Sequence, residues 1–121
     1  MKELKFKAWD KVKKQMFTLQ AISFDMQSSA PFAVNVPHRS WEPIGKFELI
    51  QWTGLVDERG IDVYEGDWVK IQSILYKVVW NQTRACFELV EPIHLSTCNI
   101  CDVASGLIMG NQFQNPELYV K

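Results

Sequence analysis

Residues 51–69, which read QWTGLVDERGIDVYEGDWV, decide the architecture of this chain. Three glycines and a run of acidic residues separate short segments that are rich in β-branched and aromatic side chains. This stretch has no helical period, because its apolar residues come in short runs that turns interrupt. It therefore predicts strands joined by tight turns, with Gly54, Gly60 and Gly66 placed where a β-carbon would obstruct the corner.

The same pattern extends in both directions along the chain. Apolar and polar residues alternate from Leu4 to Trp9, which predicts a strand followed by a polar turn at residues 10–14. A second strand is expected over residues 16–24, with a bulge near Ala21 where the alternation changes phase. The remaining predicted strands are 47–52, 61–64, 68–71, 75–80, 84–90 and 107–109, and residues 114–119 predict a turn with a last strand or one helical turn.

Residues 26–46 are predicted as a long loop that Pro31, Pro37 and Pro43 punctuate. Loops of this length are uncommon in compact domains and are usually functional or disordered. Because the segment also carries several large apolar residues, three interpretations stay open. It packs against its own chain, it forms an arm that docks on a neighbouring subunit, or it is mobile.

Length and composition fit one small domain. The chain has 121 residues, of which 47% are hydrophobic and 22% charged, as in an ordinary globular protein. We therefore predict a single, mainly β domain over residues 1–121. It would be a small twisted antiparallel barrel, or two joined half-barrels, closed by the long central loop.

Charge is distributed unevenly along the chain. The net charge is −1, but the first 14 residues carry six lysines against two acidic residues. Lysines beside an edge strand prevent sheets from pairing with one another, and the near-zero total charge favours this interpretation. The alternative is a nucleic-acid interface, in which lysines contact phosphates and a tryptophan stacks on a base; its candidates are Lys5, Lys7, Trp9, Lys11, Lys13 and Lys14.

The chain shows no sign of secretion or membrane insertion. Residues 1–6 lead directly into a strand, so no signal peptide is expected. No segment approaches the roughly 18 apolar residues of a membrane span. Three cysteines, an odd number, predict free thiols in a reducing cytoplasm.

Four blocks of sequence carry a resemblance to a known family. They are KFKAWD at 5–10, QWTGL at 51–55 with Asp57 and Gly60, YEGDWV at 64–69, and GNQFQNPEL at 110–118. In this order the chain resembles the YopX family of phage and prophage proteins, over residues 4–118. The resemblance implies a β-rich fold, a phage origin and a host-cytoplasmic setting, and it supplies no catalytic residue. The chain departs from the family pattern at Trp52, where Tyr or Phe is expected, and in its cysteine-bearing segment 94–101.

One set of side chains has spacing that could suit a metal. His94, Cys98 and Cys101 follow a His-x3-Cys-x2-Cys pattern, and Cys86 lies eight residues earlier. These four could form a Cys3His zinc site, but strong zinc motifs usually show a second paired knuckle, which is missing here. Cys86 also falls in strand phase, where a thiol packs as a small apolar group. We therefore expect inert thiols and no cofactor.

Acidic residues crowd the glycine-rich stretch. Their spacing does not fit a calcium-binding loop, so a solvated turn is expected; they are Asp57, Glu58, Asp62, Glu65 and Asp67. We expect Asp67 to accept hydrogen bonds from the backbone of its own turn. Neither His38 nor His94 has a nucleophile at a recognisable offset, and no glycine-rich phosphate loop is present.

These observations predict a non-enzymatic β module that binds protein or assembles with itself. The five tryptophans fit core and subunit-interface packing better than base stacking, because nearly all of them fall in predicted strands. The expected partners are further copies of the chain, or a phage or host protein. Nucleic acid stays the alternative, and no membrane partner is expected.

Overall fold

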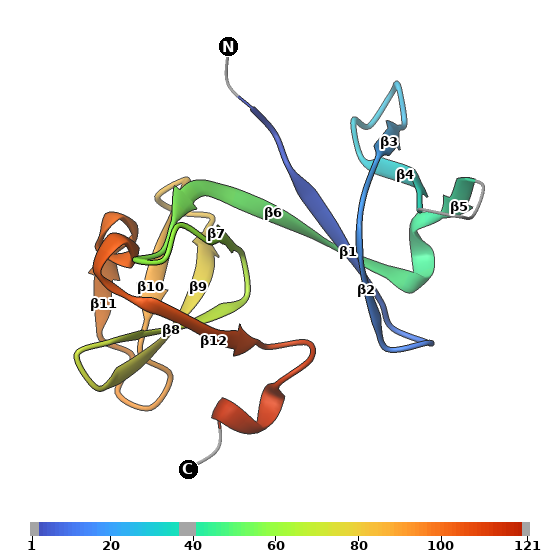
Figure 1. Ribbon diagram of the computed structural model, residues 1–121. Coiled ribbons are helices and arrows are strands. Elements are labelled where there is room, and N and C mark those ends of the chain that lie inside the picture. Colours follow the sequence, from blue (N-terminus) through green and yellow to red (C-terminus); the bar gives the residue numbers. More distant parts are fainter. Residues whose placement is uncertain (1–2, 37–40, 120–121) are drawn as a thin grey trace. The chain divides into compact units, whose positions relative to one another are not determined.

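The computed structural model describes residues 3–36 and 41–119 and divides the chain into two compact units (Figure 1). The N-terminal unit is Leu4–Gln51. The C-terminal unit is Trp52–Lys121 together with Met1–Glu3. Strand β6 (Phe47–Val56) contributes its first half to one unit and its second half to the other. The chain is mostly β, and this confirms the predicted fold class.

The N-terminal unit begins with a hairpin. Strand β1 (Phe6–Asp10) lies between β2 (Gln15–Thr18) and the first half of β6, and both pairings are antiparallel. The predicted polar turn after β1 is held by Asp10, whose carboxylate accepts hydrogen bonds from the backbone N–H groups of Val12 and Lys13 at 3.0 and 2.9 Å. An aspartate that binds its own turn in this way fixes where the hairpin reverses.

A separate three-stranded sheet completes this unit, in the order β3 (Ala21–Phe24), β4 (Pro31–Asn35) and β5 (Trp41–Pro43). A 3-10 helix, η1 (Ile44–Lys46), follows it. The prediction of one strand over residues 16–24 is therefore wrong, because the chain leaves the β1 sheet after Thr18 and enters a second sheet at Ala21.

The prediction of a long loop over residues 26–46 is also wrong. Its prolines stand at strand ends, where a missing N–H costs no ladder hydrogen bond: Pro31 begins β4 and Pro43 ends β5. Pro37 lies outside the described residues. The turn into β4 is short because the carboxylate of Asp25 accepts the N–H groups of Gln27 and Ser28. Ala8, Val34, Val36 and Phe47 form the buried core of this unit.

The C-terminal unit contains a five-stranded antiparallel sheet. In spatial order its strands are β11 (Thr97–Asn99), β10 (Cys86–Val90), β9 (Ile74–Asn81), β8 (Asp67–Ile71) and β12 (Leu107–Asn111). The short strand β7 (Asp62–Tyr64) pairs with the second half of β6. Two 3-10 helices, η2 (Ile100–Ser105) and η3 (Pro116–Tyr119), complete the unit. Strand β11 and helix η2 were not predicted.

A second buried core lies inside this unit. Its members come from β7, β8, β9, β10 and η2, and they are Val63, Val69, Tyr76, Val78, Leu89 and Val103. Most are β-branched residues, which pack well on a pleated surface. No helix among the described residues has the length and apolar character needed to cross a membrane.

Candidate functional site

Asp57, the first residue of the acidic loop, is buried inside the C-terminal unit. The residue is 3% exposed, and the two oxygens of its side chain accept hydrogen bonds from three backbone N–H groups. Oδ1 binds Arg59 at 2.9 Å and Ile61 at 3.0 Å, and Oδ2 binds Ile108 of β12 at 3.1 Å. Asp67 is buried as well. The predicted solvated turn is therefore wrong at these two positions, because their carboxylates replace missing backbone partners.

The loop around Asp57 covers the outer edge of strand β12. Arg59 donates from Nη2 to the carbonyl oxygen of Ile108 at 2.9 Å, and the N–H of Glu58 donates to the carbonyl of Gly106 at 2.9 Å. With the bond from Ile108 to Asp57, the loop supplies hydrogen-bond partners that a neighbouring strand would otherwise provide. An edge strand with free backbone groups invites pairing with other chains, so this loop closes the sheet.

Two opposing effects act on the pKa of Asp57. Burial raises the pKa, because it disfavours the charged carboxylate. The backbone N–H groups of Ile108, Ile61 and Arg59, together with the guanidinium of Arg59, stabilise the charged form and hold the pKa below its ordinary value. Asp57 is therefore ionised, and its carboxylate stabilises the loop through hydrogen bonds to the backbone.

The tight turn at residues 64–67, the next turn of the stretch 51–69, is also held by an aspartate side chain. Asp67 Oδ2 accepts the N–H of Tyr64 at 2.8 Å, which confirms the prediction that Asp67 binds its own turn. Gly66 has a φ of 88° and joins two other segments through its backbone, donating to Val78 and accepting from Gln112 at 2.8 Å each. Gly54 and Gly60 also have positive φ, which an L side chain rarely adopts, but a Cβ at either would meet nothing within 4 Å. A Cβ would meet a neighbouring side chain at Gly66, where it would lie 2.9 Å from Phe113 Cε2. These glycines and aspartates of the stretch 51–69 thus maintain the fold.

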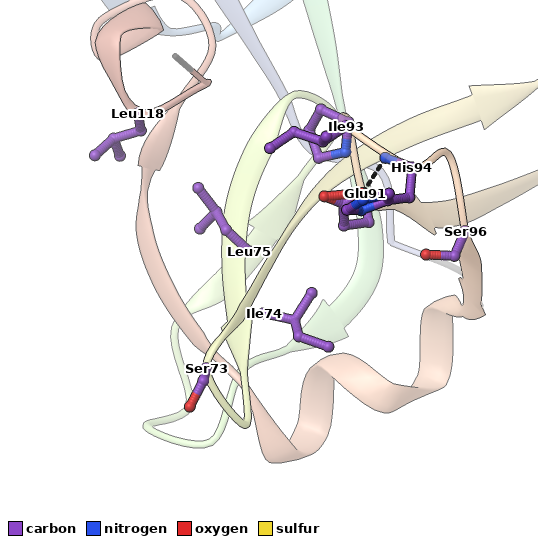
Figure 2. Close-up of a pocket in the computed structure, with 9 residues that line it drawn as sticks. Ser73, Ile74, Leu75, Glu91, Ile93, His94, Ser96 and Leu118 are labelled. Atoms are coloured by element: carbon purple, nitrogen blue, oxygen red, sulfur yellow. Dashed lines mark hydrogen bonds and ion pairs between the residues drawn. The ribbon is translucent and has the colours of Figure 1, made fainter. Parts of the chain in front are cut away.

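An open apolar groove lies elsewhere on the C-terminal unit, with a volume of about 330 Å³ (Figure 2). We call it the apolar groove. Three segments line it: the turn between β8 and β9, the turn between β10 and β11, and helix η3. Its lining residues are Ser73, Ile74, Leu75, Glu91, Pro92, Ile93, His94, Ser96 and Leu118.

Backbone geometry positions the two turns of the groove. Gln72 and Ser73 both have positive φ, 50° and 82°, and this tight reversal places Ile74 at the start of β9. In the other turn, Leu95 has a φ of 59° and donates its N–H to the carbonyl of Glu91 at 2.8 Å. The N–H of Glu91 donates to Ser96 at 2.8 Å, so the turn closes on itself and presents Ile93 outward.

Glu91 and His94 are the titratable groups of the groove (Figure 2). Glu91 Oε2 accepts the backbone N–H of His94 and lies 3.5 Å from its Nδ1. The backbone hydrogen bond from His94 is the main reason that the pKa of Glu91 is lowered. The His94 ring is mostly exposed, and in the part of the chain that the structure describes no hydroxyl or thiol is hydrogen-bonded to it. The pair therefore lacks the nucleophile that a hydrolytic triad requires.

The predicted metal candidates do not form a site. Cys86 begins β10, Cys98 lies in β11, Cys101 is exposed in η2, and His94 lies in the groove turn. Among the described residues, no three His, Cys, Asp or Glu side chains are grouped so that they could hold a metal ion. Cys98 instead packs against the core, and its thiol beside Tyr76 raises the pKa of that residue. His38 lies outside the described residues.

The predicted nucleic-acid candidates are only partly accessible. Trp9 is 7% exposed and lies in the middle of its sheet, so it offers no ring face for a base. Lys5 and Lys7 are half-buried, whereas Lys11, Lys13 and Lys14 are exposed at the β1–β2 turn. Trp68 is also buried, Trp52 is half-buried, and Trp41 and Trp80 remain substantially exposed.

Sequence reasoning missed the apolar groove. Its lining comes from two turns and a helix that are distant in sequence, and of the lining apolar residues only Leu118 belongs to a sequence block identified above. The sequence carries only a weak signal for the apolar groove. Ile93 places a large apolar group in a turn, where Gly, Pro, Asn, Asp and Ser are the usual residues.

Comparison with known proteins assigns the chain to a family. A family model described as YopX protein matches residues 5–119. The crystal structure of protein EF1440 from Enterococcus faecalis is similar over 98% of this chain and 99% of that one, with a TM-score of 0.76 and 22% sequence identity. At this identity the likeness shows a shared fold. No curated protein matches the chain. Since the family model spans nearly all of the sequence, the protein belongs to the YopX family.

Proposed function

We propose that this protein is a non-enzymatic binding module whose apolar groove holds an extended apolar segment of another protein. The observation that carries the proposal is the exposure of large apolar side chains around a hollow. Ile74 is 46% exposed and Ile93 is 56% exposed, and both line the apolar groove with Leu75 and Leu118. Single exposed apolar residues are ordinary, but a cluster around a concave surface is typical of a binding site.

The charge at the groove indicates what the partner carries. Glu91, whose pKa is lowered by its hydrogen bond to the backbone of His94, carries an ionised carboxylate beside the apolar lining at neutral pH. A segment with an apolar anchor next to a lysine or arginine would satisfy both features. On this proposal the protein is a phage or prophage accessory protein in the host cytoplasm, and its partner is a phage or host protein.

The hydrogen bonds that the buried carboxylates already accept support a binding role over a catalytic one. A general base needs a free lone pair, and a general acid needs a proton, within reach of the substrate. The carboxylates of Asp57 and Asp67 are buried and accept hydrogen bonds from backbone N–H groups. These side chains hold turns in place, which is the role of a scaffold.

The experiment selects peptides and then tests where they bind. A random peptide library is panned on the immobilised full-length protein, and the enriched peptides are titrated calorimetrically against the wild type and two variants. Ile93→Glu places a charge in the apolar groove. Ile61→Glu is the matched control, because Ile61 is 45% exposed and does not line this groove.

We expect apolar peptides with a basic neighbour to be enriched. Their affinity should fall at least tenfold on Ile93→Glu and stay unchanged on Ile61→Glu. Peptides that bind both variants as tightly as the wild type would show that the groove is not the site. A library that yields no saturable binder would refute the proposal.

A further inference from the structure

We propose that strand β3 is a self-association edge, at which a second copy of this chain adds its own β3 in antiparallel pairing. The two three-stranded sheets would then form one continuous sheet of six strands. This surface lies in the N-terminal unit, so the inference does not depend on the apolar groove. The inference rests on which edge strands, in the part of the chain that the structure describes, are protected from pairing with another strand.

The edges in the C-terminal unit are blocked. Asp57 and Arg59 bind the N–H and the carbonyl of Ile108 in β12, and Glu58 binds the carbonyl of Gly106 just before this strand. At the other edge, β11 has only three residues and runs directly into η2, whose first turn is capped by the side chain of Asn99. Short edges and covered edges are two of the devices by which proteins prevent unwanted strand pairing.

Three further edge strands, β7, β2 and β5, are protected in other ways. Strand β7 has only three residues, and the N–H of Tyr64 already donates to the side chain of Asp67. Strand β2 follows a turn that carries three exposed lysines, so two copies would repel each other there. Strand β5 has three residues and ends in Pro43, which has no N–H to donate.

Strand β3 has none of these protections. Its four residues, Ala21 to Phe24, include no charge and no proline, and no strand in the described part of the chain pairs with its outer edge. Phe24 is 53% exposed, and Met26 in the following turn is fully accessible. An apolar, uncharged edge strand is the type that accepts another strand.

The strand is complementary to itself. In an antiparallel pair with a two-fold axis, directly opposite residues lie on the same face. With Ser23 opposite Ser23 of the second copy, Ile22 lies opposite Phe24, and Asp25 lies opposite Ala21. Apolar side chains then face each other, and no like charges do.

A shallow hollow beside this edge supports the same arrangement. It has a volume of about 430 Å³ and is lined by Ile22, Ser23, Ala33 and Trp41. Ser23 lies opposite Ala33 in the β3–β4 register, so two small side chains leave the ring of Trp41 half exposed. A strand added at β3 would bring its own side chains next to this apolar surface.

The test measures self-association of the full-length protein by sedimentation velocity, up to a concentration of about 1 mM. Ser23→Lys adds a charge at the centre of the proposed pair, and Phe24→Ser removes the apolar contact without adding charge. Thr18→Lys is the control, because it adds the same charge to the exposed edge strand β2. Circular dichroism confirms that each variant is folded.

We expect a concentration-dependent dimer for the wild type, for Thr18→Lys and for the groove variant Ile93→Glu. The dimer dissociation constant should rise at least tenfold in Ser23→Lys and in Phe24→Ser. A Ser23→Cys variant, oxidised and mapped by peptide mass, should give a dimer cross-linked at position 23. A wild type that remains monomeric, equal weakening by Thr18→Lys, or cross-links at the native cysteines alone would overturn the inference.

Discussion

The carboxylate of Asp57 connects three backbone N–H groups that have no strand to pair with. One of these groups, Ile108, is 51 residues away in sequence, so the contact fixes tertiary structure as well as the local turn. Removing an acceptor from a buried N–H leaves the cost of desolvation unmatched. Asp57 is therefore the residue at which a minimal change should have a large effect on stability.

We expect Asp57→Asn to lower the free energy of unfolding by about 2 kcal/mol, because the amide nitrogen would face another donor at Arg59 or Ile108. Chemical denaturation at pH 7 measures this change. The control Glu58→Gln removes the same charge from the neighbouring exposed side chain and should change stability by less than about 0.5 kcal/mol. Equal effects of the two substitutions would contradict the role of Asp57.

The stability of the wild type should also depend on pH through this residue. Because the pKa of Asp57 is lower in the folded protein than its ordinary value of 3.8, its contribution is fully present above that value. The contribution is lost as the pH falls through the folded pKa. Asp57→Asn should show a smaller loss of stability between about pH 5 and pH 2 than the wild type. Identical pH profiles would show that Asp57 is not stabilised in its charged form.

Substitutions at Gly60 and Gly106 distinguish the stability cost of a strained backbone from the cost of a steric clash. Gly60 has a φ of 81° but open space around its α-carbon, whereas a Cβ on Gly106 would lie 2.6 Å from Val69 Cγ1 and 2.8 Å from Ile71 Cγ1. Gly60→Ala should cost about 1 kcal/mol, and Gly60→Asn should recover part of that loss, because Asn tolerates positive φ. Gly106→Ala should cost about 1–3 kcal/mol, and Gly106→Asn should recover nothing. Thermal unfolding of the four variants tests this order.

At the scale of elements, the turn between β8 and β9 carries strain that can be removed. Ser73 adopts a φ of 82°, a value typical of glycine. Ser73→Gly should raise the free energy of unfolding by about 1 kcal/mol. Thr83→Gly is the control, because Thr83 lies in the next hairpin turn without a positive φ. The account of this turn fails if both substitutions lower the melting temperature equally.

Elements with local signals could be predicted from the sequence. Alternation and turn glycines identified the strands around residues 47–90, because a hairpin is encoded by residues close to one another. The strand β11 and the separation of β2 from β3 could not be predicted, since both depend on which sheet each segment joins. The apolar groove is of the same kind. Leu118 reaches it from a helix more than forty residues beyond Ile74.

At the scale of the whole molecule, the chain has two buried cores that share no residue. Strand β6 is common to both units, and the YopX family model spans both of them. The two surfaces to which we assign binding roles therefore belong to different units. The apolar groove lies in the C-terminal unit, and the β3 edge lies in the N-terminal unit.

The distribution of charge makes a further prediction about nucleic acid. With a net charge of −1 and Trp9 buried, we expect no change in the fluorescence anisotropy of labelled single- or double-stranded DNA, even at about 50 mM salt. Binding that weakens steeply with salt would support the nucleic-acid alternative. If such binding disappears when Lys11, Lys13 and Lys14 are replaced by Gln, the β1–β2 turn is the interface.

The most direct test of the central claim is a map of amide chemical shifts in the full-length protein as a selected peptide is added. On the proposal that the groove binds the peptide and that the turns of residues 51–69 maintain the fold, saturable shifts should concentrate at residues 73–75, 91–96 and 118. The amide signals of the buried turn residues Asp57, Gly66 and Asp67 should shift little. Shifts centred on those turn residues, with the groove unchanged, would contradict this account.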